Sequence, residues 1–188
     1  MKNLYLTAIL PPEQLAIQID EIRQECAEKF GLKAGLKPPV HITLFKPLHI
    51  DSSKEELLIK ILRQTASNHE PFNINLENFD SFDIKTLFIR VEKNTHLSAL
   101  QKEITYIYSK NKMEEEEIKS KNTFKPHVTI AYRDIPPHVF PLIWEDFKNR
   151  KFKRSFTVTH FSLLKHNGKK WDSFKEFPLC KPALLSLF

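Results

Sequence analysis

Pro39-Val40-His41-Ile42-Thr43-Leu44 in the first half of the chain is echoed by Pro126-His127-Val128-Thr129-Ile130 in the second half. Both stretches are rich in β-branched and apolar residues, which predicts a β-strand for each. Because residues i and i+2 of a strand project from the same face, each histidine should point the same way as its threonine. The residues between them are expected to anchor each strand in the core.

Further strands and helices are predicted around these two stretches from the spacing of the apolar residues. Strands are expected at residues 4–10, 41–48, 72–79, 86–91, 126–132 and 156–162, with a return strand from Trp171 to Pro178. Helices are expected from Pro12 to Gly31, from a cap at Asp51 through Leu62, from Leu97 to Ile107, and at residues 137–149. Asn167-Gly168 is typical of a tight hairpin turn. The acidic run from Glu114 to Glu117 is expected to be a solvated helix end or loop.

Length and composition favour a single domain covering residues 1–188. A chain of this length with 41% apolar residues can bury a substantial core, and its three glycines leave no glycine-rich linker that would divide it. The order of elements predicts an α+β fold with two similar lobes, because the His-x-Thr pattern occurs once in each half. A pseudo-twofold relation between the lobes would bring both patterns to one cleft.

Charge and cysteine content point to the partners and the environment. The net charge of +6 favours a phosphate-bearing or otherwise anionic partner through long-range attraction. Cys26 and Cys180 form no CxxC pair, so neither a disulfide framework nor a thiol-rich zinc site is indicated. The apolar stretch at the start of the chain stops at Pro11-Pro12, which is too short for a signal peptide or a membrane span. We expect a cytoplasmic monomer without a membrane segment.

Two histidines and two threonines in one cleft suit a reaction at phosphorus. One imidazole can take a proton from the attacking hydroxyl while the other gives a proton to the departing oxygen. The unperturbed pKa of histidine, about 6.5, lets a neutral and a protonated ring coexist near neutrality. The hydroxyls of Thr43 and Thr129 can donate to the non-bridging phosphate oxygens. We therefore expect His41 and His127 to be the acid/base pair, in either order, with no metal and no cofactor.

These residues resemble the two-histidine (2H) phosphoesterases, in particular the bacterial 2'-5' RNA ligase-like proteins and the cyclic nucleotide phosphodiesterases. The resemblance rests on the two His-x-Thr motifs, on their separation by a lobe's length, and on the Asn167-Gly168 hairpin followed by Trp171 and Phe177-Pro178-Leu179. It implies a bilobal α+β fold with two antiparallel sheets and flanking helices around a central cleft. It also implies metal-free cleavage of ribonucleotides or RNA that carry 2',3'-cyclic phosphates or 2'-5' linkages, with 2'-5' ligation as the reverse reaction.

Strand parity suggests two further substrate contacts. Phe45 has the parity of His41 and could stack on a base, although ordinary core packing is an equally good interpretation. Bacterial ligase-like members often continue the first motif with a basic residue and then an aromatic one, whereas here Phe45 precedes Lys46. Arg133 has the parity of His127 and could hold a second or terminal phosphate, or it could be a surface residue past a bent strand end.

A second interpretation, from a different functional class, is a binding module. The same cleft would then recognise RNA ends or nucleotides without turnover. Binding of phosphate alone is served better by Arg and Lys than by titrating imidazoles, which favours the enzyme. Other chemistries lack their signatures, because the chain has no HExxH motif, no P-loop and no GxSxG elbow.

Overall fold

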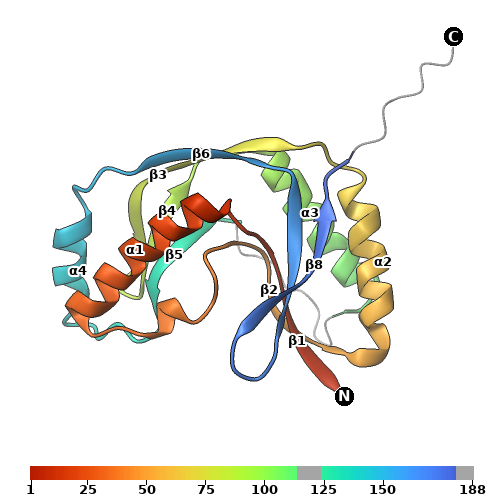
Figure 1. The fold of residues 1–188 in the computed structure, drawn as a ribbon, viewed down its shortest axis with the longest axis horizontal. Helices are drawn as coiled ribbons and strands as arrows, with labels where there is room; N and C mark the ends of the chain where they lie inside the picture. The colour runs from red at the N-terminus through yellow and green to blue at the C-terminus, as the bar shows by residue number, and fades with distance from the viewer. Residues whose placement is uncertain (114–123, 181–188) are drawn as a thin grey trace, which may run out of the picture.

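The computed structural model describes residues 1–113 and 124–180, in which eight β-strands form one antiparallel sheet that carries four α-helices (Figure 1). The strands are β1 (Lys2–Ile9), β2 (Ile42–Asp51), β3 (Phe72–Phe82), β4 (Thr86–Val91), β5 (His127–Tyr132), β6 (Lys153–Val158), β7 (His160–His166) and β8 (Trp171–Pro178). The helices are α1 (Glu13–Phe30), α2 (Glu55–Ala66), α3 (Thr95–Lys110) and α4 (Phe140–Phe147), with short 3-10 turns at Ala34–Leu36 and Ser52–Lys54. The α+β class is therefore confirmed. The acidic run at Glu114 to Glu117 lies outside the described residues.

The sheet consists of two halves that meet at a single residue pair. The strand order is β6-β3-β4-β5-β2-β1-β7-β8, and the central neighbours β2 and β5 are registered only by Ile42 opposite Val128 in the described chain. We call β1, β2, β7 and β8 the first half-sheet, and β3, β4, β5 and β6 the second half-sheet. The two sheets expected from the sequence are thus the two halves of one continuous sheet.

The helices that precede the two His-x-Thr strands are exchanged between the half-sheets. Helix α1 follows β1 in the chain but packs on β5, and α3 follows β4 but packs on β2. Figure 1 shows the result, with α1 and α4 over one half-sheet and α2 and α3 over the other. Helix α4 reaches the second half-sheet through Phe147, whose ring centroid is 5.0 Å from that of Phe79 in β3. The arrangement is pseudo-twofold, with β1-α1-β2-α2 matched by β4-α3-β5-α4.

The local signals for element ends are confirmed by the backbone. Gly31 ends α1 in the left-handed conformation, at φ +69°, and its N–H donates to the carbonyl of Ala27. The carboxylate of Asp51 accepts the N–H of Ser53 at 2.9 Å and so caps the 3-10 turn at Ser52–Lys54, whereas α2 itself begins after Lys54 without a side-chain cap. The Asn167-Gly168 hairpin joins β7 to β8, with Gly168 at φ +95°.

The single strand expected at residues 156–162 is instead two strands in different half-sheets. Strand β6 pairs with β3 at the edge of the second half-sheet, whereas β7 pairs with β1 and β8 in the first. In Figure 1 the ribbon bends at the end of β6, where the chain leaves the second half-sheet. The alternation of buried residues breaks at this strand boundary, because Phe156 and Val158 are buried in β6 and the next buried residue is Phe161 rather than His160.

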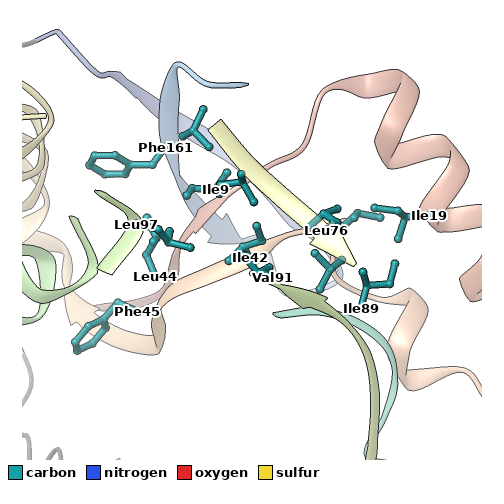
Figure 2. Packing of buried hydrophobic residues seen from close by; sticks show 14 of the residues in the cluster. Ile9, Ile19, Ile42, Leu44, Phe45, Leu76, Ile89, Val91, Leu97 and Phe161 are labelled. Carbon is teal, nitrogen blue, oxygen red and sulfur yellow. The ribbon is translucent and has the colours of Figure 1, made fainter. Parts of the chain in front are cut away.

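One hydrophobic cluster runs under both half-sheets and fixes the strands that carry the motifs. Ile42 and Val128 are fully buried in it, so each motif is anchored by the residue between its histidine and its threonine. Figure 2 shows Ile42 between Leu44 on one side and Ile89 of the second half-sheet on the other. Truncation of a residue this deeply buried to alanine costs about 2–5 kcal/mol of unfolding free energy.

Two remaining observations concern the cysteines and the membrane. Cys26 is buried and Cys180 is exposed, and both are free thiols. Among residues 1–113 and 124–180, no helix combines the length and the apolar character that crossing a membrane requires.

Candidate active site

The pair Ile42–Val128 brings the two His-x-Thr motifs onto one face of the sheet. In an antiparallel ladder, the residues on either side of a partnered pair all project to the face opposite that pair. Ile42 and Val128 point into the core, so His41, Thr43, His127 and Thr129 surround the junction on the other face. All four side chains are half-buried. We call this side of the sheet the site face.

Both imidazoles are held by the same type of hydrogen bond. Nδ1 of His41 donates to the carbonyl of Pro39 at 2.7 Å, and Nδ1 of His127 donates to the carbonyl of Lys125 at 2.8 Å. Because a carbonyl only accepts, each neutral ring carries its proton on Nδ1. Nε2 is then left for proton transfer on both rings, as an acceptor when the ring is neutral and as a donor when it is charged.

The surroundings lower the pKa of both histidines. Burial disfavours the charged form and is the main cause for each, with the carbonyl hydrogen bonds opposing it. The pKa of His41 is lowered further by the positive charges of Arg23 and His127. Repulsion between the rings means that protonation of one disfavours protonation of the other, which suits a pair that must hold one proton between them.

The loop that leads into the first motif is held by α1 and by the residues that follow β5. The buried guanidinium of Arg23 donates to the carbonyl of Gly35 and, at 2.8 Å, to that of Pro38. From the other side, the carboxylate of Asp134 accepts the backbone N–H groups of Lys33 and Ala34 at 2.7 and 2.8 Å. Asp134 follows β5, so the end of the second motif strand positions the approach to the first.

Matching β-bulges follow the two threonines and correct the expectation for Phe45. The register slips where Thr7 and Ala8 of β1 face Phe45 and Thr43 of β2. Leu44 and Phe45 consequently both point into the core, where Phe45 is only 6% exposed and meets the Tyr108 ring edge-on at 4.4 Å. The ring of Phe45 is therefore on the helix side of the sheet and not beside His41.

The equivalent bulge in β5 shifts the parity of the residues after Thr129. Leu87 and Phe88 of β4 face Ala131 and Thr129, and Ile130 and Ala131 are both buried. Tyr132 therefore returns to the site face, where it pairs with Thr86. Arg133 comes after the strand at φ +76° and is exposed, with its guanidinium 4.9 Å from the centroid of the Tyr132 ring.

Three residues beside His127 were not predicted from the sequence to lie near the site. Phe88 is the strand partner of Thr129, and Phe82 is the partner of Thr86, so both lie on the site face. Arg90 is the strand partner of His127, and its Nε donates to the carbonyl of Glu77. Neither phenylalanine stands out among fifteen in the sequence, and their position depends on the pairing of β3, β4 and β5.

The described part of the chain offers no preformed metal site. Over residues 1–113 and 124–180, no three His, Cys, Asp or Glu side chains gather in a way that could hold a metal ion. Metal independence stays a prediction for a chelator experiment.

Comparison with known proteins identifies the family of the chain. The family model of the 2'-5' RNA ligase superfamily matches residues 11–170. The chain belongs to the 2'-5' RNA ligase superfamily. Its curated relatives include a candidate phosphoesterase of Geobacillus sp. strain WCH70, 25% identical, with 92% of this chain and 94% of the relative covered. A candidate phosphoesterase of Oceanobacillus iheyensis is 26% identical, with 93% and 97% covered.

Solved structures of the superfamily fold superpose on nearly the whole chain. The crystal structure of TT0787 of Thermus thermophilus has a TM-score of 0.73 at 19% identity, covering 97% of this chain and all of the other. The crystal structure of E. coli LigT complexed with 3'-AMP has a TM-score of 0.66 at 17% identity, covering 95% and 99%. These likenesses confirm the bilobal fold that the sequence resemblance implied.

Proposed function

We propose that this member of the 2'-5' RNA ligase superfamily is a metal-independent phosphodiesterase that acts on ribonucleotide 2',3'-cyclic phosphates or 2'-5' linkages. The observation that carries the proposal is the junction at Ile42–Val128, which sets His41 and His127 on one face with Nδ1 of each ring occupied. Two Nε2 atoms on either side of a phosphorus atom supply the base and the acid that a displacement needs. Each ring has a threonine hydroxyl beside it to donate to the phosphate.

The hydrolytic reaction uses one histidine in each protonation state. Neutral Nε2 of one ring accepts a proton from water as the water oxygen bonds to phosphorus. The bond from phosphorus to one ribose oxygen breaks, and that oxygen takes the proton from the charged ring. For a 2'-5' linkage the ribose 3'-hydroxyl is the nucleophile and the 5'-oxygen leaves, which gives a 2',3'-cyclic phosphate; the reverse of this step is ligation. Protons exchanged with water restore the starting states.

Asymmetry around the rings supports His41 as the base and His127 as the acid in hydrolysis. Arg23 disfavours a proton on His41, whereas His127 has no such charge among the causes that shift its pKa. A phosphodiester anion bound between the rings favours the charged form of both, and the ring farther from Arg23 takes the proton first. Arg133, whose guanidinium lies 4.9 Å from the centroid of the Tyr132 ring, is our candidate for binding a further phosphate of the substrate.

Ligands bound by a protein of the same fold support a nucleotide substrate. E. coli LigT has been crystallised with 3'-AMP, with phosphate and with ATP. The net charge of +6 fits an anionic ligand. We infer the same ligand class here from the shared fold and the four site-face residues.

The test is turnover of 2',3'-cyclic AMP and of a 2'-5' linked diadenylate by the wild type and by His41→Asn and His127→Asn. Loss of an acid or base lowers kcat by about 10²- to 10⁴-fold. His160→Asn, a histidine of β7 that lies 3.8 Å from Glu176, is the matched control and should retain full activity. Activity should persist in a chelator. Abolition by EDTA contradicts the mechanism, and binding of 3'-AMP without any turnover favours the binding module.

A further inference from the structure

Phe82, Phe88 and His127 form a three-ring cluster on the site face. The centroids of Phe82 and Phe88 are 4.2 Å apart at an interplanar angle of 34°, so the two rings are in close contact at a tilt. Phe82 meets the imidazole of His127 at 4.9 Å and 89°, and Phe88 meets it at 5.1 Å. The cluster therefore connects the end of the β3–β4 hairpin directly to a proposed catalytic ring.

The two phenylalanines differ in how much of each side chain is exposed to solvent. Phe88 is 5% exposed, and its ring packs against those of Phe82 and His127. Phe82 is half-buried, and its ring contacts those of Phe88 and His127, so the exposed part of the side chain lies away from these two contacts. A half-exposed flat ring packed against a second ring is a suitable surface for another aromatic plane.

The first half-sheet has no ring at the equivalent place. Ala8 occupies the position in the first half-sheet that Phe88 occupies in the second. Ala8 is the strand partner of Thr43 at its bulge, and Phe88 is the strand partner of Thr129 at the other. Around Ala8 the cluster on this face consists of Leu6 and Leu164, with Leu10 and Trp171 packed against it. Trp171 belongs to β8, three strands away from β2. The pseudo-twofold symmetry of the motifs is thus broken in favour of the His127 side.

We propose that Phe82 is the base-stacking residue of this protein and that its substrates carry a nucleobase on the ribose whose phosphate lies between the histidines. The proposal rests on the proposed function for the position of the phosphate. A base is separated from the phosphate of its own ribose by only a few bonds, and Phe82 is in ring contact with His127. Stacking is tolerant of base identity, so purines and pyrimidines are both accepted.

The experiment compares two ligands that differ only in the base. Adenosine 3'-monophosphate and 1-O-methylribose 3-phosphate are titrated calorimetrically into the wild type, Phe82→Ala, Phe82→Leu and Phe82→Trp. Loss of one stacking ring should weaken binding of adenosine 3'-monophosphate by about 10- to 100-fold in Phe82→Ala and Phe82→Leu. Phe82→Trp should bind it like the wild type. All variants should bind the base-free phosphate equally.

Phe174→Ala is the matched control, since Phe174 is a half-buried ring near Tyr5, and it should not affect either ligand. Equal weakening of both ligands in Phe82→Ala would show that Phe82 only supports His127 and would overturn the proposal. Wild-type affinity in Phe82→Leu, or no binding of adenosine 3'-monophosphate to the wild type, would overturn it as well.

Failure of the proposed function gives a different result. Base-dependent binding without hydrolysis of cyclic nucleotides removes the enzymatic proposal and leaves the stacking role intact. Hydrolysis of cyclic nucleotides with the same KM in the wild type and Phe82→Ala keeps the enzymatic proposal and removes the stacking role.

Discussion

Arg23 and His41 donate hydrogen bonds to neighbouring carbonyl groups of one loop. The guanidinium of Arg23 donates to the carbonyl of Pro38, and the imidazole of His41 donates to the carbonyl of Pro39. The loop is therefore fixed at the two residues where it turns into the first motif. Through its charge, Arg23 also lowers the pKa of the ring that it helps to position.

Comparing Arg23→Met, which removes the hydrogen bonds and the charge, with Arg23→Lys, which keeps the charge, separates these two effects. The hydrogen bonds to Gly35 and Pro38 are lost, and since bonds from a charged donor contribute about 1.5–3 kcal/mol each, urea unfolding should show a loss of several kcal/mol. The pKa of His41 should rise, which moves the acid limb of the kcat/KM profile to higher pH. Arg23→Lys should lose stability but keep the limb in place. If the acid limb of the kcat/KM profile stays at the same pH in Arg23→Met, the role of Arg23 is purely structural.

Replacing Gly35 by alanine should disturb the contact between this loop and β5. A Cβ at Gly35 would lie 2.7 Å from the carbonyl oxygen of Ile130, a backbone atom that has no room to retreat. We expect a destabilisation of about 1–3 kcal/mol in chemical denaturation, together with reduced kcat, because the displaced loop carries His41. Gly31→Ala meets nothing within 4 Å and strains only its own positive φ, so it should cost about 1–2 kcal/mol without affecting kcat.

Replacing either site-face threonine by valine removes a phosphate donor while keeping the side-chain shape. Thr43→Val and Thr129→Val should each lower kcat by about 10²- to 10³-fold with a smaller effect on KM, since the donor is needed most in the transition state. Steady-state kinetics on a 2',3'-cyclic nucleotide measures this. Thr157→Val in β6, whose hydroxyl bonds to Asn73, serves as the control. A change confined to KM would mean that the hydroxyls bind substrate and transition state equally.

The pH dependence follows from the lowered pKa values of both rings. The base must be neutral, so kcat/KM should rise with pH through a pKa below 6.5; the acid must be charged, so it should fall again through the second lowered pKa. The maximum of kcat/KM should therefore lie on the acid side of pH 6.5. The bound anion raises both pKa values, which should shift the kcat profile to higher pH. A maximum of kcat/KM near about pH 8 would contradict this environment.

The sequence predicts the four residues around the junction because they precede the bulges. His41 and Thr43, like His127 and Thr129, are related by uninterrupted strand parity, and their repetition in the chain implies symmetry. Parity fails immediately afterwards, where the slip in register buries Phe45 and moves Tyr132 to the site face. A bulge depends on the neighbouring strand, so a single strand read alone cannot reveal it.

The helices and strands were predictable from the sequence, whereas the pairing of the strands in the sheet was less so. Helix ends at Gly31 and the turn at Gly168 follow from local backbone chemistry. The division between β6 and β7 and the proximity of Phe82 to His127 arise from contacts between segments far apart in the chain. These are the features that alternation and spacing do not encode.

The exchange of α1 and α3 means that the repeated sequence unit is not a folding unit. A fragment comprising the first half of the chain would contain α1 without β5, the strand it covers, and β2 without α3, the helix that covers it. Each half would expose an apolar surface shaped for the other. Severed halves should therefore remain unfolded when expressed alone and regain structure only when mixed. Any duplication that gave rise to this architecture required each copy to cover the sheet of the other with its helix.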